Sequence, residues 1–329
     1  MVARGAVPQC RTDAIKLLPV MQSALDTAGP LATHIADLFW IFVGVAAMVY
    51  VVVIGFLVRA LRRRREEGEA PRDSATAIRA IGVASGATAV VLVGLALSDF
   101  FAGRALARSP SDALRVQITA HQWWWEIEYP DAVPAQRIRT ANELHIPVGK
   151  PVALELISDD VIHSFWVPSL NGKKDLIPGY ANGLQLLASR PGEYGGTCAE
   201  FCGLQHAQMR IAVHAQEPGE FAQWQDAQRR PAAEPSEPTL VRGRDIFLNS
   251  TCAQCHAVQG TDAAATTGPD LTHVGSRASL AAGALPNDAQ ALATWIRNPS
   301  LIKPGTRMPA SELSGDELAA LVAWLGSLK

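Results

Sequence analysis

Two long apolar runs lie close together near the start of the chain and form its strongest hydrophobic pattern. Leu38–Val58 holds 21 residues without a charged side chain, and a helix of that length would span ~31 Å, the thickness of a bilayer's hydrocarbon core. Buried helices of soluble domains are rarely apolar on every face. The second run, Ala80–Leu97, contains three glycines, which suit close helix packing in lipid. The pattern predicts a transmembrane hairpin with helices over 36–58 and 80–101.

The segment between the two runs, 59–79, is rich in arginine. It contains Arg59, Arg62, Arg63, Arg64, Arg65, Arg72 and Arg79. Short loops rich in arginine or lysine stay in the cytoplasm. We therefore expect the N-terminal segment 1–35, and everything after about residue 105, on the outer side of a bacterial-type inner (plasma) membrane. Residues 1–35 show no apolar stretch typical of a secretory signal.

Beyond the hairpin the pattern changes twice. Residues 112–228 contain short β-type segments such as Val152–Ile157 and Arg210–His214, separated by Pro, Gly and Asn turns, which predicts a small β-sandwich or barrel. Residues 229–238 hold three prolines without apolar periodicity and are expected to form an extended linker. Residues 239–329 show helical periodicity at both ends, so a small all-α domain is predicted.

Composition narrows the class of protein. The 329 residues carry 29 basic and 31 acidic side chains, whereas nucleic-acid-binding proteins carry a basic excess on one face. Nucleic acid is therefore not an expected partner. Charged residues make up 18% of the chain and apolar residues 48%, against the usual ~25% charged. This balance favours a multi-pass membrane part, in contact with lipid, joined to a soluble part.

The predicted α-type domain contains the sequence Cys252-Ala-Gln-Cys255-His256. This is the attachment sequence of a c-type haem. Two thiols three positions apart bond covalently to one porphyrin edge, and the next imidazole lies under the iron. A disulfide or half of a zinc site are the alternatives, but no second cysteine pair follows in this domain. A covalently attached haem c is therefore predicted.

For the sixth iron ligand the same domain offers Met308 and His273. Met308 lies in a proline-bounded segment that can fold over the other haem face. A thioether ligand raises the reduction potential, as electron carriers require, so Met308 is the expected ligand. The arrangement resembles class I cytochrome c, and Gly268–Leu271 matches that family's haem-packing loop.

The predicted β domain carries a second cluster of soft ligands. The segment from Cys198 to Met209 contains Cys202 and His206, and His163 lies upstream. Two thiolates, two imidazoles and a thioether argue for copper and against zinc. A disulfide between the two cysteines is the alternative in an oxidising compartment, but the His and Met at +4 and +7 from Cys202 favour a metal. Two thiolates can bridge two copper ions.

At these residues the chain, over about 20–228, resembles subunit II of haem-copper cytochrome c oxidases. The resemblance implies a two-helix transmembrane hairpin and a cupredoxin-like domain that holds the binuclear copper centre CuA. The implied copper ligands are His163, Cys198, Cys202, His206 and Met209, with the backbone carbonyl of Glu200. The side chain of Glu200 is implied to contact a magnesium ion shared with subunit I.

The same resemblance points to Trp123 as the residue at which electrons enter. It is the first of three consecutive tryptophans. The alternative is a structural role in the sandwich core or at the membrane surface. In a strand, Trp123 and Trp125 would face one way and Trp124 the other.

Together these features predict a subunit of a terminal respiratory oxidase, an oxidoreductase and translocase. Electrons from cytochrome c or another respiratory donor would pass through haem c and CuA to subunit I, where oxygen is reduced to water with proton translocation. This chain has no set of intramembrane histidines for oxygen chemistry. The equivalent subunit of a copper-containing nitric oxide reductase, or a membrane-tethered carrier outside an oxidase, remain alternatives. A quinol oxidase subunit II would lack the copper ligands.

Overall fold

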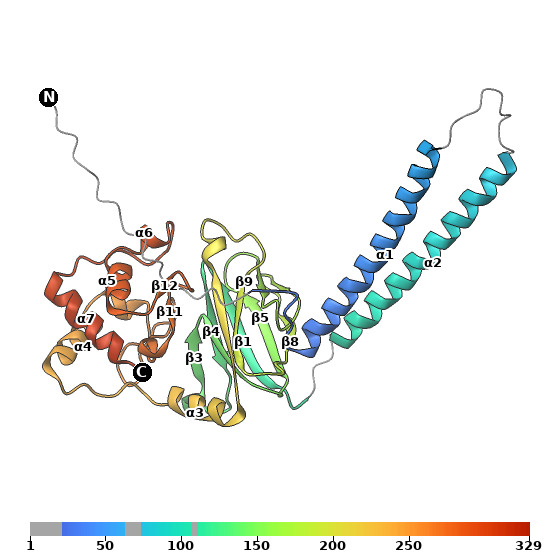
Figure 1. Cartoon of the computed structure of the whole chain (residues 1–329). Helices are drawn as coiled ribbons and strands as arrows, with labels where there is room; N and C mark the ends of the chain where they lie inside the picture. The colour runs from blue at the N-terminus through green and yellow to red at the C-terminus, as the bar shows by residue number, and fades with distance from the viewer. Residues whose placement is uncertain (1–21, 63–73, 107–110) are drawn as a thin grey trace, which may run out of the picture.

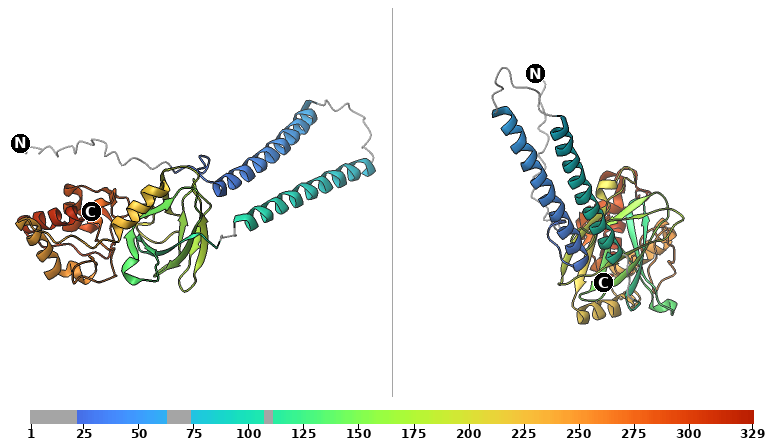
Figure 2. Two further views of the ribbon diagram at one scale, coloured as in Figure 1. Left: turned by 90° about the horizontal axis from the view of Figure 1, so that it is seen from below. Right: turned by 90° about the vertical axis from the view of Figure 1, so that its right-hand side faces the viewer.

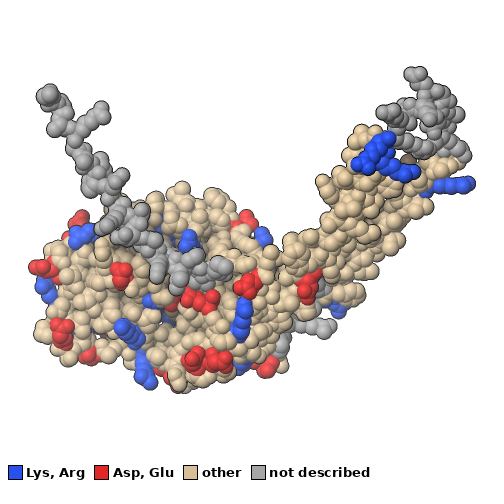
Figure 3. All heavy atoms as spheres, in the orientation of Figure 1, with Lys and Arg blue, Asp and Glu red and all other residues tan. Residues whose placement is uncertain are grey.

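The computed structural model describes residues 22–62, 74–106 and 111–329. Two helices, α1 (Pro30–Arg62) and α2 (Ser74–Leu106), run side by side away from the rest of the molecule (Figure 1). Each is long and apolar enough to cross a membrane, and none of its most apolar stretch is buried within the chain. On the face seen in Figure 3, the charged side chains of the pair lie near its ends. The hairpin therefore presents an apolar surface to its surroundings.

Both helices are longer than the predicted spans. Residues 59–62 and 74–79 are helical, although the arginine-rich sequence predicts a loop there. A helix continues past the apolar run because long basic side chains can reach toward water while their stems remain against apolar surface. The rest of the predicted loop, 63–73, and the first 21 residues of the N-terminal segment lie outside the described residues.

The chain entering α1 is held on the next domain. The backbone N–H of Ala28 donates to the carbonyl of Ser169 at 2.7 Å, and the N–H of Ser189 donates to the carbonyl of Ala28 at 2.8 Å. Ala28 is buried. These bonds attach the start of α1 directly to the domain that contains Ser169 and Ser189.

That domain, here called the sandwich domain (112–228), consists of two five-stranded sheets. The first has the strand order β3-β2-β1-β5-β8 and the second β4-β10-β9-β6-β7. β1 pairs in parallel with β5, and β4 with β10, whereas the other neighbours are antiparallel. The strands are β1 (Leu114–His121), β2 (Trp124–Tyr129), β3 (Ile138–Ala141), β4 (Glu143–Pro147), β5 (Val152–Ser158), β6 (His163–Trp166), β7 (Lys174–Leu176), β8 (Asn182–Leu186), β9 (Gly192–Cys198) and β10 (Arg210–Gln216).

The sandwich core follows from alternation along the strands. In β1, every second residue from Val116 is buried, as expected when one face of a sheet covers another. Trp125, Phe165 and Leu156 are fully buried between the sheets. The rings of Trp125 and Phe165 meet edge to face at 5.7 Å. Of the predicted sandwich or barrel, the structure has the sandwich.

Helix α3 follows the last strand of the sandwich domain, a linker then leads to a second domain, and short 3-10 turns occur in both domains. The helices are α3 (Pro218–Gln228), α4 (Pro238–Asn249), α5 (Ala289–Arg297), α6 (Pro299–Ile302) and α7 (Gly315–Ser327), with short 3-10 turns at η1 (Pro134–Gln136), η2 (His206–Gln208), η3 (Thr251–Gln254) and η4 (Val274–Ser276). The predicted all-α domain, here called the helical domain (239–329), also contains a minimal ribbon of β11 (Ser279–Leu280) and β12 (Leu285–Pro286).

The core of the helical domain is the contact between α4 and α7. Phe247 and Trp324 are both buried, with ring centroids 5.2 Å apart. A side chain at Gly243 would place its Cβ 2.1 Å from the carbonyl oxygen of Ala320, so only glycine permits this close approach. A capping box at Ser314 begins α7.

The helical domain packs against the sandwich domain, on the side away from the two long helices (Figure 1, Figure 2). The linker is not a free tether, because the N–H of Ala232 donates to the carbonyl of Gln259 at 2.9 Å. The sandwich domain and the helical domain, together called the two outer domains, therefore meet at a defined interface.

Candidate metal centre and haem site

The predicted copper ligands come together at one end of the sandwich. His163 begins β6 and Cys198 ends the neighbouring strand β9, while Cys202, His206 and Met209 lie on the loop before β10. The Sγ atoms of Cys198 and Cys202 are 3.8 Å apart. Since a disulfide requires ~2.05 Å and both cysteines are free, the disulfide alternative is wrong for this structure.

Each thiol has its own imidazole. Cys198 Sγ is 3.8 Å from His163 Nδ1, and Cys202 Sγ is 3.7 Å from His206 Nδ1. A further atom that can ligate a metal lies beside each thiol. Cys198 Sγ is 3.2 Å from the carbonyl oxygen of Glu200, and Cys202 Sγ is 3.9 Å from Met209 Sδ. One thiol thus lies beside an imidazole and a carbonyl oxygen, and the other beside an imidazole and a thioether. This set of ligating atoms fits a pair of soft metal ions.

The electrostatics of this cluster favour a thiolate. The hydrogen bond from Cys202 lowers the pKa of Cys198, burial opposes this, and His163 lowers it further. The same bond raises the pKa of Cys202. Burial lowers the pKa of His163, but Asp160 and Cys198 outweigh burial and raise it. Thiolate is the form that binds metal.

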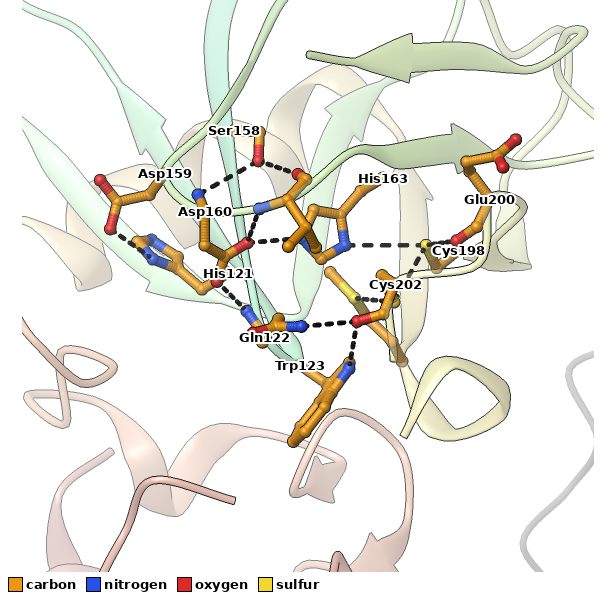
Figure 4. A network of polar contacts seen from close by, with 12 residues as sticks. His121, Gln122, Trp123, Ser158, Asp159, Asp160, His163, Cys198, Glu200 and Cys202 are labelled. Carbon is orange, nitrogen blue, oxygen red and sulfur yellow. Dashed lines mark hydrogen bonds and ion pairs between the residues drawn. The ribbon is translucent and has the colours of Figure 1, made fainter. Parts of the chain in front are cut away.

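Asp160 is a candidate functional residue that the sequence analysis missed. Its Oδ1 lies 2.8 Å from His163 Nε2, and its Oδ2 accepts the backbone N–H of Gln122 at 2.7 Å. Metal-bound histidines are usually oriented in this way by a carboxylate on the second ring nitrogen, and here Nδ1 is left facing Cys198 (Figure 4). The signal available in the sequence was a carboxylate three residues before the histidine.

Trp123 lies before β2 and differs from its two neighbours. Its indole Nε1 donates to the carbonyl of Cys202 at 2.9 Å, and the side chain is 8% exposed. Trp125 is fully buried in the sandwich core, and Trp124 stacks on His121 with ring centroids 4.4 Å apart. Figure 4 shows the indole of Trp123 directed from the cysteine cluster toward the helical domain.

The side chain of Glu200 is exposed and turned away from the two thiols (Figure 4). Only its backbone carbonyl takes part in the cluster. A carboxylate so placed is accessible to a second protein or to an ion at the surface.

In the helical domain, Cys252 lies on the η3 turn, Cys255 is the residue that ends it, and His256 follows directly. Its Nδ1 donates to the carbonyl oxygen of Pro269 at 2.7 Å, which leaves the lone pair of Nε2 available to a metal. Burial lowers the pKa of His256, which favours the neutral ligand form. A Cβ at Gly268 would lie 2.7 Å from His256 Cε1, so glycine is required there. These features fit an axial histidine.

Met308 and His273 lie in different surroundings. Met308 follows α6 on a loop and packs, half-buried, against the hydrophobic core of the helical domain. His273 is buried, with Nε2 3.2 Å from the carbonyl oxygen of Gln228. That nitrogen of His273 is therefore engaged at the boundary between the two domains.

A second group with metal-ligating atoms consists of Glu143, His145 and His214, whose atoms lie within 4.8 Å of one another. One carboxylate oxygen of Glu143 already accepts the backbone N–H groups of Ala278 and Ser279 in the helical domain. The positive charge of Arg277 also acts on Glu143 and disfavours a further cation. We therefore interpret this group as an interdomain contact.

Comparisons with known proteins agree with both halves of the outer region. Residues 132–216 match the family described as cytochrome c oxidase subunit II, periplasmic domain, and residues 240–329 match cytochrome c. The chain is 36% identical over 319 residues to cytochrome c oxidase subunit 2 of Alkalihalophilus pseudofirmus, covering 93% of this chain and 91% of that protein. The protein of the same name from Bacillus subtilis is 35% identical over 251 residues, 73% of this chain and 69% of that protein.

Among solved structures, the periplasmic domain of subunit II of cytochrome oxidase from Bradyrhizobium japonicum aligns with 31% identity. The alignment covers 37% of this chain and 97% of that chain, with a TM-score of 0.35.

Proposed function

Because this chain belongs to the cytochrome c oxidase subunit 2 family, we propose that it takes electrons from a respiratory donor into its helical domain and delivers them through its sandwich domain to subunit I. The family implies a copper centre in the sandwich domain and a haem in the helical domain. As a subunit II, the chain works with other subunits of an oxidoreductase. The order of the electron path is the proposal.

Six residues of the sandwich domain would hold the binuclear copper centre CuA. They are His163, Cys198, Cys202, His206, Met209 and, through its carbonyl, Glu200. When bound, the copper pair would accept and release single electrons. Asp160 holds the ring of His163, so the chain presents the site already oriented.

Four residues of the helical domain would hold haem c. Cys252 and Cys255 would attach it, His256 would ligate the iron on one side, and Met308 on the other. The hydrogen bond from His256 Nδ1 to Pro269 supports this assignment, because it fixes the orientation of the ring. A thioether at Met308 would keep the potential high enough for a respiratory carrier.

The observation that carries the proposed path is the position of Trp123. Its indole donates to the carbonyl of Cys202, and the opposite side of the ring approaches Gly305, where a Cβ would lie 3.4 Å from the ring. Gly305 lies three residues before Met308. Trp123 therefore connects the loop of a proposed haem ligand with the backbone of a proposed copper ligand.

The remaining steps take place on partners. We infer that oxygen is reduced to water on subunit I, with proton translocation, and that the two outer domains lie on the periplasmic side. The exposed carboxylate of Glu200 is available for a magnesium ion shared with subunit I. Arg59 and Arg62 at the end of α1 support a cytoplasmic position for the tip of the hairpin.

The experiment that tests this path compares the assembled oxidase with a variant carrying Cys252→Ala and Cys255→Ala. After rapid mixing with reduced cytochrome c, we expect haem c to be reduced first in the wild type. Copper reduction should follow at a rate independent of donor concentration. The double variant should retain copper but lose most oxygen consumption. Full oxygen consumption by the haem-free variant would contradict the path.

A further inference from the structure

A lysine of the helical domain is buried between the two outer domains. Lys303 follows α6 and is 3% exposed. Its Nζ donates to the carbonyl oxygens of Trp123 at 2.8 Å, Gln208 at 3.1 Å and Ala281 at 3.1 Å. An ammonium group has three N–H donors, so each donor has an acceptor. Two acceptors belong to the sandwich domain and one to the helical domain.

The two acceptors in the sandwich domain belong to residues next to the proposed copper ligands. Gln208 immediately precedes Met209. Trp123 contacts the carbonyl of Cys202 through its indole. Lys303 therefore connects the helical domain to the backbone that carries the copper site.

The residues that follow Lys303 continue this contact. The side-chain Nε2 of Gln205 donates to the carbonyl of Pro304 at 2.8 Å. Gly305 has φ +85°, and a Cβ there would lie 2.9 Å from Leu204 Cδ1 and 3.4 Å from the ring of Trp123. The absence of a side chain at this position is what lets the loop lie on the indole.

A second contact between the two domains involves a buried carboxylate of the sandwich domain. Glu143 of the sandwich domain is 5% exposed, and its Oε1 accepts the N–H of Ala278 at 2.9 Å and of Ser279 at 3.1 Å. The same short segment ends at Ala281, whose carbonyl accepts from Lys303. The buried Glu143 thus binds the start of the segment 278–281, and the buried Lys303 binds its end.

Burying a charged ammonium group costs free energy, so Lys303 is better explained by a preference for one arrangement of the two domains than by a gain in stability. Burial lowers the pKa of Lys303 to about 8, and Cys202 acts in the opposite direction. A buried charge that is satisfied in one arrangement disfavours every other arrangement, since any slide of the domains leaves it unpaired. The three acceptors of Lys303, on both domains, therefore favour the relative position that the domains have here.

We propose that Lys303 is a positioning residue for electron transfer between the two outer domains, because its three hydrogen bonds hold the loop of Met308 against Trp123. The proposal rests on the proposed function. The contact also covers Trp123, which is 8% exposed with the helical domain in place. A soluble donor therefore meets the helical domain and not the indole.

The test uses the assembled oxidase with Lys303→Met. The matched control is Lys329→Met, because Lys329 is exposed in the same domain. After rapid mixing with reduced cytochrome c, the rate at which electrons leave haem c for copper should fall at least about tenfold in Lys303→Met, as expected for a misplaced reacting group. The bimolecular reduction of haem c, its spectrum and the copper content should match those of the control. That split between rates is not expected from a general loss of structure.

Gly305→Ala provides an independent variant if Lys303→Met loses haem or copper. It leaves every charge in place but introduces a Cβ between Leu204 and Trp123, so the same step should slow. A wild-type rate of electron transfer from haem c to copper in Lys303→Met would overturn the positioning role but leave the electron path intact. If Lys303→Met loses haem or copper, the same rate in Gly305→Ala gives the answer. If copper in the wild type were reduced independently of haem c, the proposed function itself would fail.

Discussion

The indole Nε1 of Trp123 donates a hydrogen bond of 2.9 Å to the backbone carbonyl of Cys202. The opposite side of the ring faces Gly305 of the helical domain. The side chain of Trp123 therefore lies between the backbone of Cys202 and the helical domain. Its neighbour Trp124 stacks on His121 instead, so adjacent tryptophans have different surroundings.

Trp123→Phe should slow electron transfer from haem c to copper by on the order of tenfold or more, because the hydrogen bond to Cys202 is lost and the ring is shorter. Rapid-mixing spectroscopy of the assembled oxidase measures this rate. Trp124→Phe is the control and should transfer electrons at the wild-type rate. Equal rates in the two variants would assign Trp123 to packing alone.

Met308→Ala should leave haem covalently attached through Cys252 and Cys255 but lower its reduction potential, since a thioether ligand is lost. A redox titration followed by absorbance checks this result. His273→Gln is the control, because His273 Nε2 already contacts the carbonyl of Gln228. A retained sulfur-to-iron band with an unchanged potential in Met308→Ala would exclude Met308 as ligand.

Asp160→Asn should weaken copper binding by roughly 10–100-fold, the usual effect of removing a carboxylate that orients a histidine ligand. The wild type should hold two coppers per chain, as measured by metal analysis at controlled free copper. Asp159→Asn is the control, because the exposed Asp159 pairs with His121 and not with His163. The same affinity in both variants would show that Asp160 does not support the copper site.

Glu143 should make stability depend on pH. Burial raises its pKa above the ordinary 4.5, although His214, Arg277 and the N–H groups of Ser279 and Ala278 act to lower it. A raised acid pKa contributes stability that is present below pH 4.5 and is lost as pH rises through the raised value. Glu143→Gln keeps an acceptor for both N–H groups and should flatten this decline.

The measurement for Glu143 is the thermal midpoint of the full chain as a function of pH. Glu155→Gln is the matched control, because Glu155 is exposed on the same domain. Its profile should follow the wild type. A profile for Glu143→Gln that runs parallel to the wild type from pH 4.5 upward would show that Glu143 does not titrate with folding.

The topology can be tested with one cysteine introduced at a time into the assembled oxidase carrying Cys10→Ser, with that background as the blank for the four remaining cysteines. Ser74→Cys lies at the start of α2 and should react with a membrane-impermeant maleimide only after spheroplasts are permeabilised, because basic segments remain in the cytoplasm. Ser236→Cys, at an exposed linker position, should react in intact spheroplasts. The opposite pattern would reverse the orientation.

Elements governed by local spacing were predictable from the sequence. β5 and β10 lie where the alternating segments predicted them, and α4 and α7 where the helical periodicity did. The donor types at both sites were also readable, because ligand spacing within a short motif is set by covalent connection. The strand pattern predicted a sandwich or a barrel, and the two separate sheets decided for the sandwich. Helix α3 was not predicted.

The tertiary structure decided how these parts act together. Lys303 donates to three backbone carbonyls, and Glu143 accepts two backbone N–H groups of the helical domain. Nearly every residue offers such groups, so no residue type marks them. Asp160 became a support for His163 only through its orientation. The sequence by itself determined the hairpin, the two domains and the donor sets, because local periodicity and spacing specify them. Only the folded chain determined the surroundings of Trp123, since they join side-chain donors to backbone carbonyls 79 to 180 positions away.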